Sequence, residues 1–207
     1  MILPSDIQQA PRYPMAYAAC LIGVAPATLA RWCAGPVPWV ATPTTSDGRL
    51  RYVSFLGLAE AWGVRALRQT GVPPIRLRAA IAAWRRAGGP PAAGASQRFL
   101  LGQGVTALAG MMWGPDPDCP TVLTFPLGNT VVHIDPLRRF GDPHLAGTAV
   151  AVVWERIAAG EAWDEVAADY DLPLTAVHDV MTYWPTHRRR RSPAPFRAGD
   201  VRNMTGP

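Results

Sequence analysis

The strongest constraint on the fold of this 207-residue chain is a series of short segments with apolar residues at helical spacing, bounded by glycine or proline. Apolar residues at positions i, i+3, i+4 and i+7 lie on one face of an amphipathic helix. The 22 prolines and 19 glycines interrupt such segments, because both residue types end helices or mark turns. No apolar run approaches the ~20 residues that span a bilayer. We therefore expect several short helices around a buried core.

The first module, residues 13–88, is predicted to be a winged helix-turn-helix. Residues 15–22 are Ala-rich and typical of a short helix, which Gly23 ends. Pro26 suits the first position of a second helix, where its missing N–H costs nothing. Two short helices joined by a tight Gly-containing turn are typical of a helix-turn-helix.

The second helix is the candidate DNA-reading element of this module. Its spacing would bury Leu29 and Trp32, and would leave Ala27, Thr28 and Arg31 on the outer face. In a helix-turn-helix, residues of this face contact base edges in the major groove. The predicted DNA-binding residues of this helix are therefore Ala27, Thr28 and Arg31.

A β-hairpin is predicted to follow as the wing of the module. Residues 39–42 and 49–53 are β-prone, and Ser46-Asp47-Gly48 between them is a turn signal. Arg49 and Arg51 would lie on this wing and neutralise DNA phosphates. The alternative is that these arginines are ordinary surface charges on a winged helix that contacts another protein.

Two further helices complete the first module. Ser54 suits the N-cap of the next helix. A last helix begins near Pro73 and keeps Arg76 and Arg78 in water. The apolar stripe of the helix after Ser54 comprises Phe55, Leu58, Ala59 and Trp62.

The second half of the chain is predicted to contain a connector and a small helical domain. Residues 89–130 are rich in Pro and Gly, with strands expected near 98–101 and 121–125. Residues 131–185 begin with a short strand at 131–134 and continue as three helices, a helix-turn-helix-like trihelical domain. The three apolar stripes comprise Val150, Val153, Trp154 and Ile157; Trp163, Val166, Ala167 and Tyr170; and Val177, Val180, Met181 and Trp184.

The expected fold class is therefore mainly α-helical. Residues 1–12 form an N-terminal extension before the winged helix-turn-helix, the β-containing connector and the trihelical domain. Residues 186–207 form an Arg-rich tail with almost nothing to bury, which predicts disorder in isolation.

Charge is distributed unevenly along the chain, whose net charge is +5 and whose basic residues are all arginine. Residues 1–95 carry 10 Arg and 3 acidic residues, a balance of +7. Residues 96–150 are near neutral at −1, residues 151–184 carry 1 Arg against 7 acids, and residues 185–207 carry 6 Arg against 1 acid. This polarity indicates at least two partners, or one partner and the chain itself.

No catalytic or metal-binding pattern is present in the sequence, so we expect a protein that is not an enzyme and holds no cofactor. The four histidines and three cysteines show no ligand spacing. The cysteines form no CxxC pair, and the first residues lack a signal-peptide pattern, so a reducing cytoplasm is expected. The histidines are His133, His144, His178 and His187, and the cysteines are Cys20, Cys33 and Cys119.

Residues 13–32 and 49–81 resemble the winged-helix DNA-binding domain of MerR-type regulators. Ala25 stands where a small polar residue usually precedes the helical proline. Residues 75–86 end at Gly88-Gly89 without the long coiled-coil helix of the sensor proteins. The resemblance implies binding to operator DNA and does not extend to small-molecule or metal sensing.

Residues 131–184 are similar to a small trihelical domain of long-unassigned function. Ala149 and Ala151 replace the arginine and proline that usually follow its Gly-Thr pair. The two modules in this order resemble VapB-type antitoxins of bacterial type II toxin–antitoxin operons. The motif residues are Ile134-Asp135-Pro136, Gly141, Pro143, Gly147-Thr148, Gly160-Glu161 and Asp169-Tyr170.

The VapB resemblance implies a PIN-like ribonuclease toxin as partner, autorepression at operator DNA and a homodimer. A PIN-type site is a carboxylate cluster that holds divalent metal, and an arginine arm can pair with such acids. The expected toxin-binding residues are Arg188, Arg189, Arg190, Arg191, Arg197 and Arg202. For the Arg188–Arg191 run, a phosphate clamp on DNA or a solvated tail without a role are the alternatives. For the whole chain, the alternatives are a MerR-like transcriptional regulator without a toxin partner, and an interaction scaffold that does not touch DNA.

Overall fold

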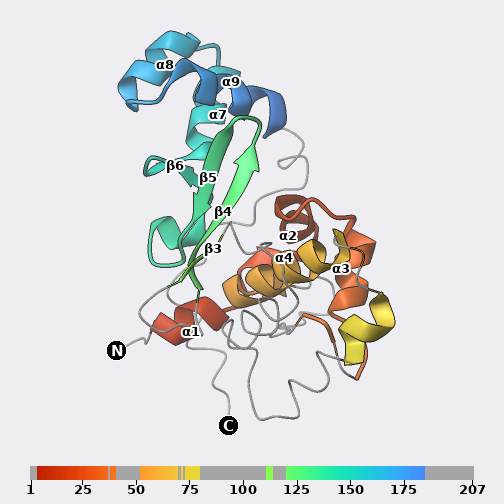
Figure 1. Ribbon diagram of the computed structural model, residues 1–207. Helices are drawn as coiled ribbons and strands as arrows, with labels where there is room; N and C mark the ends of the chain where they lie inside the picture. Colours follow the sequence, from red (N-terminus) through yellow and green to blue (C-terminus); the bar gives the residue numbers. More distant parts are fainter. Residues whose placement is uncertain are drawn as a thin grey trace.

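The described part of the chain is mixed α/β, which corrects the expectation of a mainly α-helical fold. It contains two antiparallel sheets beside its helices. The sequence predicted the strands near 121–125 and at 131–134 but not the extent of the larger sheet, because two of its strands have only two residues each, too few for a periodic signal. The computed structural model describes residues 4–36, 38–40, 52–69, 71, 73–79, 111–113 and 120–184 (Figure 1).

The regular elements described within residues 4–79, the N-terminal unit, are helices and one pair of short strands. Both helices expected around Gly23 are present, and a helix that the sequence did not indicate precedes them and contacts α4. A further helical segment spans residues 74–79. The elements are α1 (Pro4–Gln9), β1 (Tyr13–Pro14), α2 (Met15–Leu21), α3 (Pro26–Trp32), β2 (Tyr52–Val53) and α4 (Phe55–Gln69).

The expected wing hairpin is only partly within the described residues. Strand β2 covers the end of the predicted 49–53 strand, but it pairs with β1, with Tyr13 opposite Val53. Residues 39–40 form a bend and not a strand. Residues 41–51, including the predicted DNA contacts Arg49 and Arg51, lie outside the described residues.

Helix α4 begins as the sequence predicts. The backbone N–H of Gly57 donates a 3.0 Å hydrogen bond to Oγ of Ser54, which confirms Ser54 as the capping residue. Phe55, Leu58 and Ala59 of the predicted stripe are buried, and Trp62 is partly buried against the core.

The C-terminal unit, residues 111–184, has in its described residues a five-stranded antiparallel sheet, three α-helices and the short 3-10 helix η1 (Arg139–Gly141). Its strand order is β3-β4-β5-β6-β7. The strand expected near 121–125 pairs along its length with β5, so this hairpin crosses the boundary expected between residues 130 and 131. The three predicted helices are present. The elements are β3 (Met111–Trp113), β4 (Pro120–Leu127), β5 (Thr130–Ile134), β6 (His144–Leu145), β7 (Thr148–Ala149), α7 (Val150–Ala158), α8 (Trp163–Asp169) and α9 (Leu174–Tyr183).

The two outer tryptophans of the trihelical unit behave differently from each other. Trp184 is 4% exposed, as its stripe predicts. Trp163 is 40% exposed, which corrects its expected place in the core. The physical reason is its position as the first residue of a seven-residue helix, where only Val166 and Ala167 reach the core.

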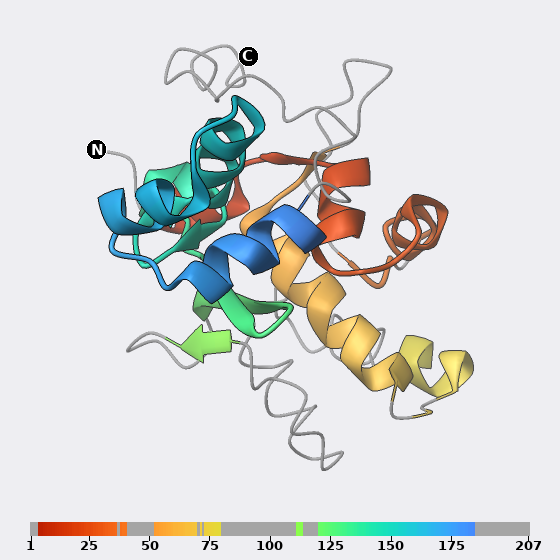
Figure 2. The same ribbon diagram turned by 90° about the horizontal axis from the view of Figure 1, so that it is seen from above.

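The two units share one hydrophobic core. Trp62 of α4 meets Phe125 of β4 edge to face at 4.6 Å between ring centroids, and Tyr17 of α2 meets Trp184 of α9 at 6.4 Å. Seen from above, α9 lies between the other C-terminal helices and the N-terminal helices α2 and α4 (Figure 2). The orientation of the N-terminal unit relative to the C-terminal helices is therefore set by packing.

The buried hydroxyl of Tyr13 joins the two units, and its removal is expected to destabilise the whole chain. It donates a 2.9 Å hydrogen bond to the carbonyl oxygen of Gly141, and burial raises the pKa of Tyr13. Tyr13→Phe leaves that buried carbonyl without its partner, so we expect a loss of about 1 kcal/mol in the free energy of unfolding. Urea unfolding measures it, with Tyr52→Phe on the paired strand as control. Equal losses in both variants would contradict this role.

Candidate functional site

Helices α2 and α3 are short and are joined by a tight turn. The chain bends by 104° between them, an angle that the predicted helix-turn-helix allows. Gly23 makes the turn with a φ of +65°, a conformation that favours glycine. The backbone N–H of Val24 closes the turn by donating to the carbonyl oxygen of Ala19 at 2.9 Å.

The outer face of α3 carries the residues predicted to read DNA. Leu29 and Trp32 are buried, so α3 is fixed to the core by one side. Ala27 and Arg31 are exposed, and Thr28 is half-buried. Ala25 precedes α3 and makes no side-chain capping hydrogen bond, because an alanine side chain has no polar atom. The structure therefore brings together three of the five predicted DNA-binding residues on one accessible face.

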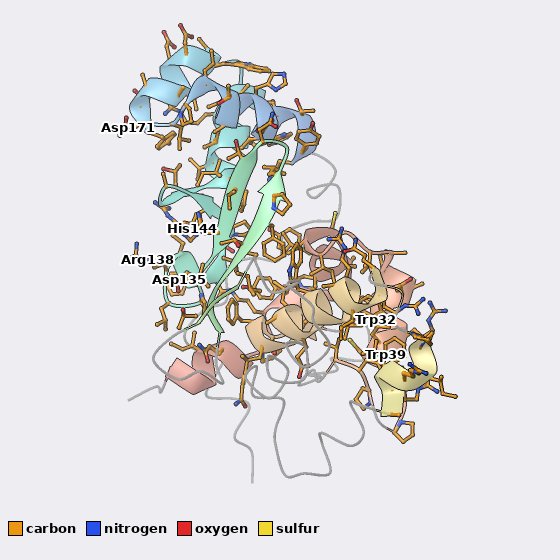
Figure 3. All side chains as sticks on the ribbon, in the orientation of Figure 1. Trp32, Trp39, Asp135, Arg138, His144 and Asp171 are labelled. Carbon is orange, nitrogen blue, oxygen red and sulfur yellow. The ribbon has the colours of Figure 1, made fainter. Side chains whose placement is uncertain are left out.

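An arginine that the sequence did not single out lies beside this face. Trp39 stacks on Trp32 at 6.3 Å between ring centroids, and its backbone N–H donates to the carbonyl oxygen of Trp32. The guanidinium of Arg78, from the helical segment at 74–79, lies over Trp39 at 5.8 Å. Figure 3 labels the two tryptophans. This stack places an exposed cation at the C-terminal end of α3. Its sequence signal is weak, because the three residues are far apart in the chain.

The acidic helices of the C-terminal unit contain one arginine, and it is fully engaged. The Nε of Arg156 donates to Oε2 of Glu161 at 2.8 Å, and Nη2 lies 2.8 Å from Oδ2 of Asp169. The guanidinium also lies over the ring of Tyr170. These hydrogen bonds lower the pKa of Glu161 and raise that of Arg156. The remaining acids of the unit keep its surface negative.

A buried carboxylate fixes the β4–β5 turn against α9. Asp179 is 4% exposed and accepts 2.9 Å hydrogen bonds from the backbone N–H of Asn129 and the hydroxyl of Thr130. Gly128, with a φ of +63°, lies so close to Asp179 and Tyr183 that no side chain fits there. Asp179 thus has a structural role in holding the turn against α9.

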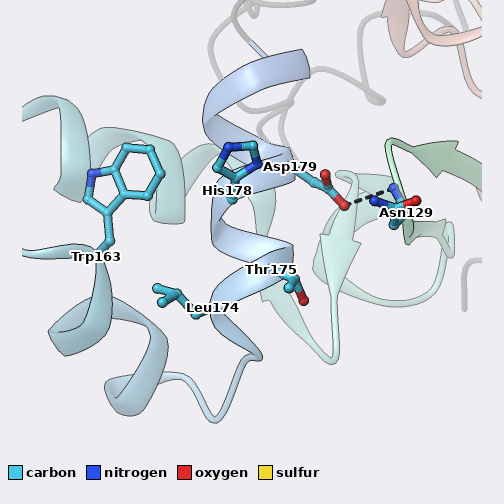
Figure 4. A pocket seen from close by; sticks show the side chains of 6 residues that line it. All are labelled: Asn129, Trp163, Leu174, Thr175, His178 and Asp179. Carbon is cyan, nitrogen blue, oxygen red and sulfur yellow. Dashed lines mark hydrogen bonds between the residues drawn. The ribbon is translucent and has the colours of Figure 1, made fainter.

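A shallow hollow of about 360 Å³ lies on the outer side of this turn (Figure 4). The ring of Trp163 lies 6.0 Å from that of His178, measured between centroids. Most of the exposed lining is apolar. The lining residues are Asn129, Trp163, Leu174, Thr175, His178 and Asp179.

Two histidines form a cross-strand pair elsewhere in the sheet. His133 of β5 faces His144 of β6, with 5.9 Å between ring centroids. Burial and the neighbouring His144 lower the pKa of His133, which favours the neutral form of the His133 ring. Within the described ranges, no group of three or more His, Cys, Asp or Glu residues is arranged to hold a metal ion.

The six arginines expected to bind a toxin, at positions 188–191, 197 and 202, lie outside the described residues. In the part of the chain that the structure describes, no single helix is long and apolar enough to cross a membrane, although the bent α2–α3 pair would be by length and composition alone.

Comparison with known proteins identifies a family segment and a related fold. Residues 132–184 match a family described as "Protein of unknown function (DUF433)". The crystal structure of Rv2018 from Mycobacterium tuberculosis is similar, with a TM-score of 0.66 and 26% sequence identity over 83% of this chain and 98% of that one. No curated protein matches the chain. The chain is therefore similar in fold to Rv2018 over most of its length, and its residues 132–184 are similar to the DUF433 family.

Proposed function

We propose that this chain is an antitoxin that neutralises a PIN-like ribonuclease toxin and represses its own operon. One observation carries the proposal: a solvent-facing α3 with Arg31 and Arg78 beside it is fixed by a common core to an acidic trihelical unit. The chain thus combines a basic surface suited to phosphates with a second unit whose charge repels nucleic acid. A protein partner for that second unit follows from the same charges.

The DNA-binding part of the proposal rests on α3 and its surroundings. Arg31 and Arg78 neutralise backbone phosphates, and Thr28 and Ala27 meet base edges in the major groove. Arg49 and Arg51 of the expected wing add phosphate contacts. A homodimer places two such surfaces on a pseudo-palindromic operator, the usual geometry for this motif.

The toxin-binding part rests on the arginines that follow α9. Their planar guanidinium groups pair with carboxylates in bidentate fashion. Inserted among the metal-holding acids of a PIN-type site, they would displace the metal and stop cleavage of RNA. The segment with these arginines follows Trp184 in the chain. The ring of Trp184 packs against Tyr17, so the residue from which the segment extends is fixed to the core.

Co-expression with the small protein encoded by the adjacent reading frame tests this function. We expect the two to co-purify, and the ribonuclease activity of the neighbour to be suppressed. A chain ending at Pro185 should inhibit at least about 100-fold less well, since each charged hydrogen bond to a buried acid contributes about 1.5–3 kcal/mol. A full-length variant with Arg188, Arg189, Arg190 and Arg191 each replaced by serine separates charge from length.

Independent migration of the two proteins contradicts the antitoxin function. If that outcome is combined with specific binding to DNA upstream of the operon, the chain is a transcriptional regulator without a toxin. Full inhibition by the chain ending at Pro185 removes the role assigned to the arginines.

A further inference from the structure

The outer face of α8 and α9 combines exposed apolar side chains with acids. Trp163 and Leu174 are 40% and 52% exposed. Trp163 and Leu174 line the hollow beside the β4–β5 turn (Figure 4). Exposed aromatic and aliphatic groups gathered around a depression mark a contact surface more often than scattered ones do. We call these two side chains and the hollow the α8–α9 face.

Acids flank the α8–α9 face without a cationic partner from the described part of the chain. Asp164 and Glu165 follow Trp163 in the first turn of α8. Asp171 lies three residues before Leu174 and is exposed. The one arginine of residues 151–184, Arg156, is held by Glu161 and Asp169. The ligand that suits this face therefore presents an apolar group between cations.

The sequence that follows α9 has this composition. Residues 185–207 contain six arginines and one acid, and their single aromatic residue, Phe196, lies between Arg191 and Arg197. Pro193 and Pro195 precede Phe196 and favour an extended backbone, which reduces the entropy cost of docking.

We propose that in the free chain residues 185–207 dock onto the α8–α9 face of the same molecule, with Phe196 in the hollow against Trp163 and Leu174. Arg191 and Arg197 then lie on the side of Asp164, Glu165 and Asp171. Desolvation of the aromatic rings and charge-assisted hydrogen bonds drive the contact.

The chain is long enough for this contact within one molecule. Helix α9 has ten residues, so Leu174 lies about 15 Å from its C-terminal end. Phe196 follows Trp184 by 12 positions, and such a segment spans up to about 40 Å when extended. The local concentration of a segment tethered this closely is in the millimolar range, so a weak contact suffices to keep it docked.

Docking would give the tail two alternative acidic partners. This consequence rests on the proposed function: a toxin site must displace the arginines from the α8–α9 face before it can bind them. The docking itself concerns the free chain and holds with or without a toxin.

Limited digestion of the full-length chain with trypsin tests the docking, because the tail has six arginine cleavage sites. Cleavage at positions 188–202 is followed by intact-mass spectrometry. We expect it to be about tenfold faster in Asp164→Asn/Glu165→Gln and in Phe196→Ser than in the unchanged chain, since cleavage tracks the undocked population. About 1 M salt should remove most of the difference for the charge variant. Asp142→Asn/Glu155→Gln, which removes two exposed acids elsewhere on the unit, is the matched control and should cleave like the unchanged chain.

Two outcomes overturn the proposal. The first is equal cleavage rates in the unchanged chain and in both test variants, with circular dichroism showing that all are folded. The second is protection that rises with protein concentration, which places the tail on a second copy. Neither readout involves toxin or ribonuclease, so failure here is distinct from failure of the proposed function.

Discussion

Replacement of Gly128 by alanine is expected to lower the free energy of unfolding by about 3 kcal/mol, from about 1 kcal/mol of left-handed backbone strain and the cost of forcing atoms into a filled site. An added Cβ would meet the Asp179 carboxylate and would lie 2.5 Å from Cε2 of Tyr183. Relief requires α9 to move from the β4–β5 turn, which breaks the hydrogen bonds of Asp179 to Asn129 and Thr130.

Gly147→Ala is the matched control for this prediction. Gly147 also has a positive φ, of +89°, but its Cβ would meet nothing within 4 Å. The control therefore has the backbone strain alone, about 1 kcal/mol. Urea unfolding of both variants measures the difference. If Gly128→Ala is no less stable than Gly147→Ala, the close approach of α9 to the β4–β5 turn does not contribute to the free energy of unfolding.

The double variant Arg31→Ala/Arg78→Ala is expected to bind DNA about 100-fold more weakly at constant salt, because each arginine contact contributes about 1–3 kcal/mol. The DNA is a duplex that covers the region upstream of the chain's own gene, and fluorescence anisotropy gives the affinity. The dependence of log affinity on log salt should also become less steep, by about 0.9 for each phosphate that the variant no longer neutralises.

Arg138→Ala is the control for the DNA-binding surface. The Arg138 side chain is 77% exposed and makes one ion pair of 3.5 Å with Asp135. It lies far from Trp32 and Trp39 (Figure 3), so its removal should leave affinity unchanged. If Arg138→Ala weakens binding as much as the double variant, DNA does not bind at α3. Circular dichroism checks the fold, since Arg78 also covers Trp39.

The candidate DNA-binding face was largely predictable, because the exposed side of a short helix follows from its apolar side. Once Leu29 and Trp32 are assigned to the core, helical geometry leaves Ala27, Thr28 and Arg31 outward, and the structure agrees. Arg78 was not predictable as part of this surface, since its position depends on the stacking of Trp39 on Trp32.

In the C-terminal unit, the helices were predictable but the exposed surface was not. Its three α-helices follow from apolar spacing. A local cap such as Ser54 in the N-terminal unit is predictable in the same way. The exposure of Trp163 does not follow from spacing, because an apolar stripe gives the direction of a side chain and not whether the core extends that far. The α8–α9 face therefore came from the tertiary structure alone.

The sequence by itself determined where the helices after residue 14 lie, the apolar side of those helices, and the division of charge into basic, acidic and basic segments. These properties are local, because they depend on side chains a few positions apart. Only the tertiary structure decided that the two units share one core, through contacts such as Tyr17 with Trp184 and Tyr13 with Gly141, 128 positions further along the chain. Such contacts depend on how whole elements pack, and complementary surfaces far apart in sequence leave no periodic signal.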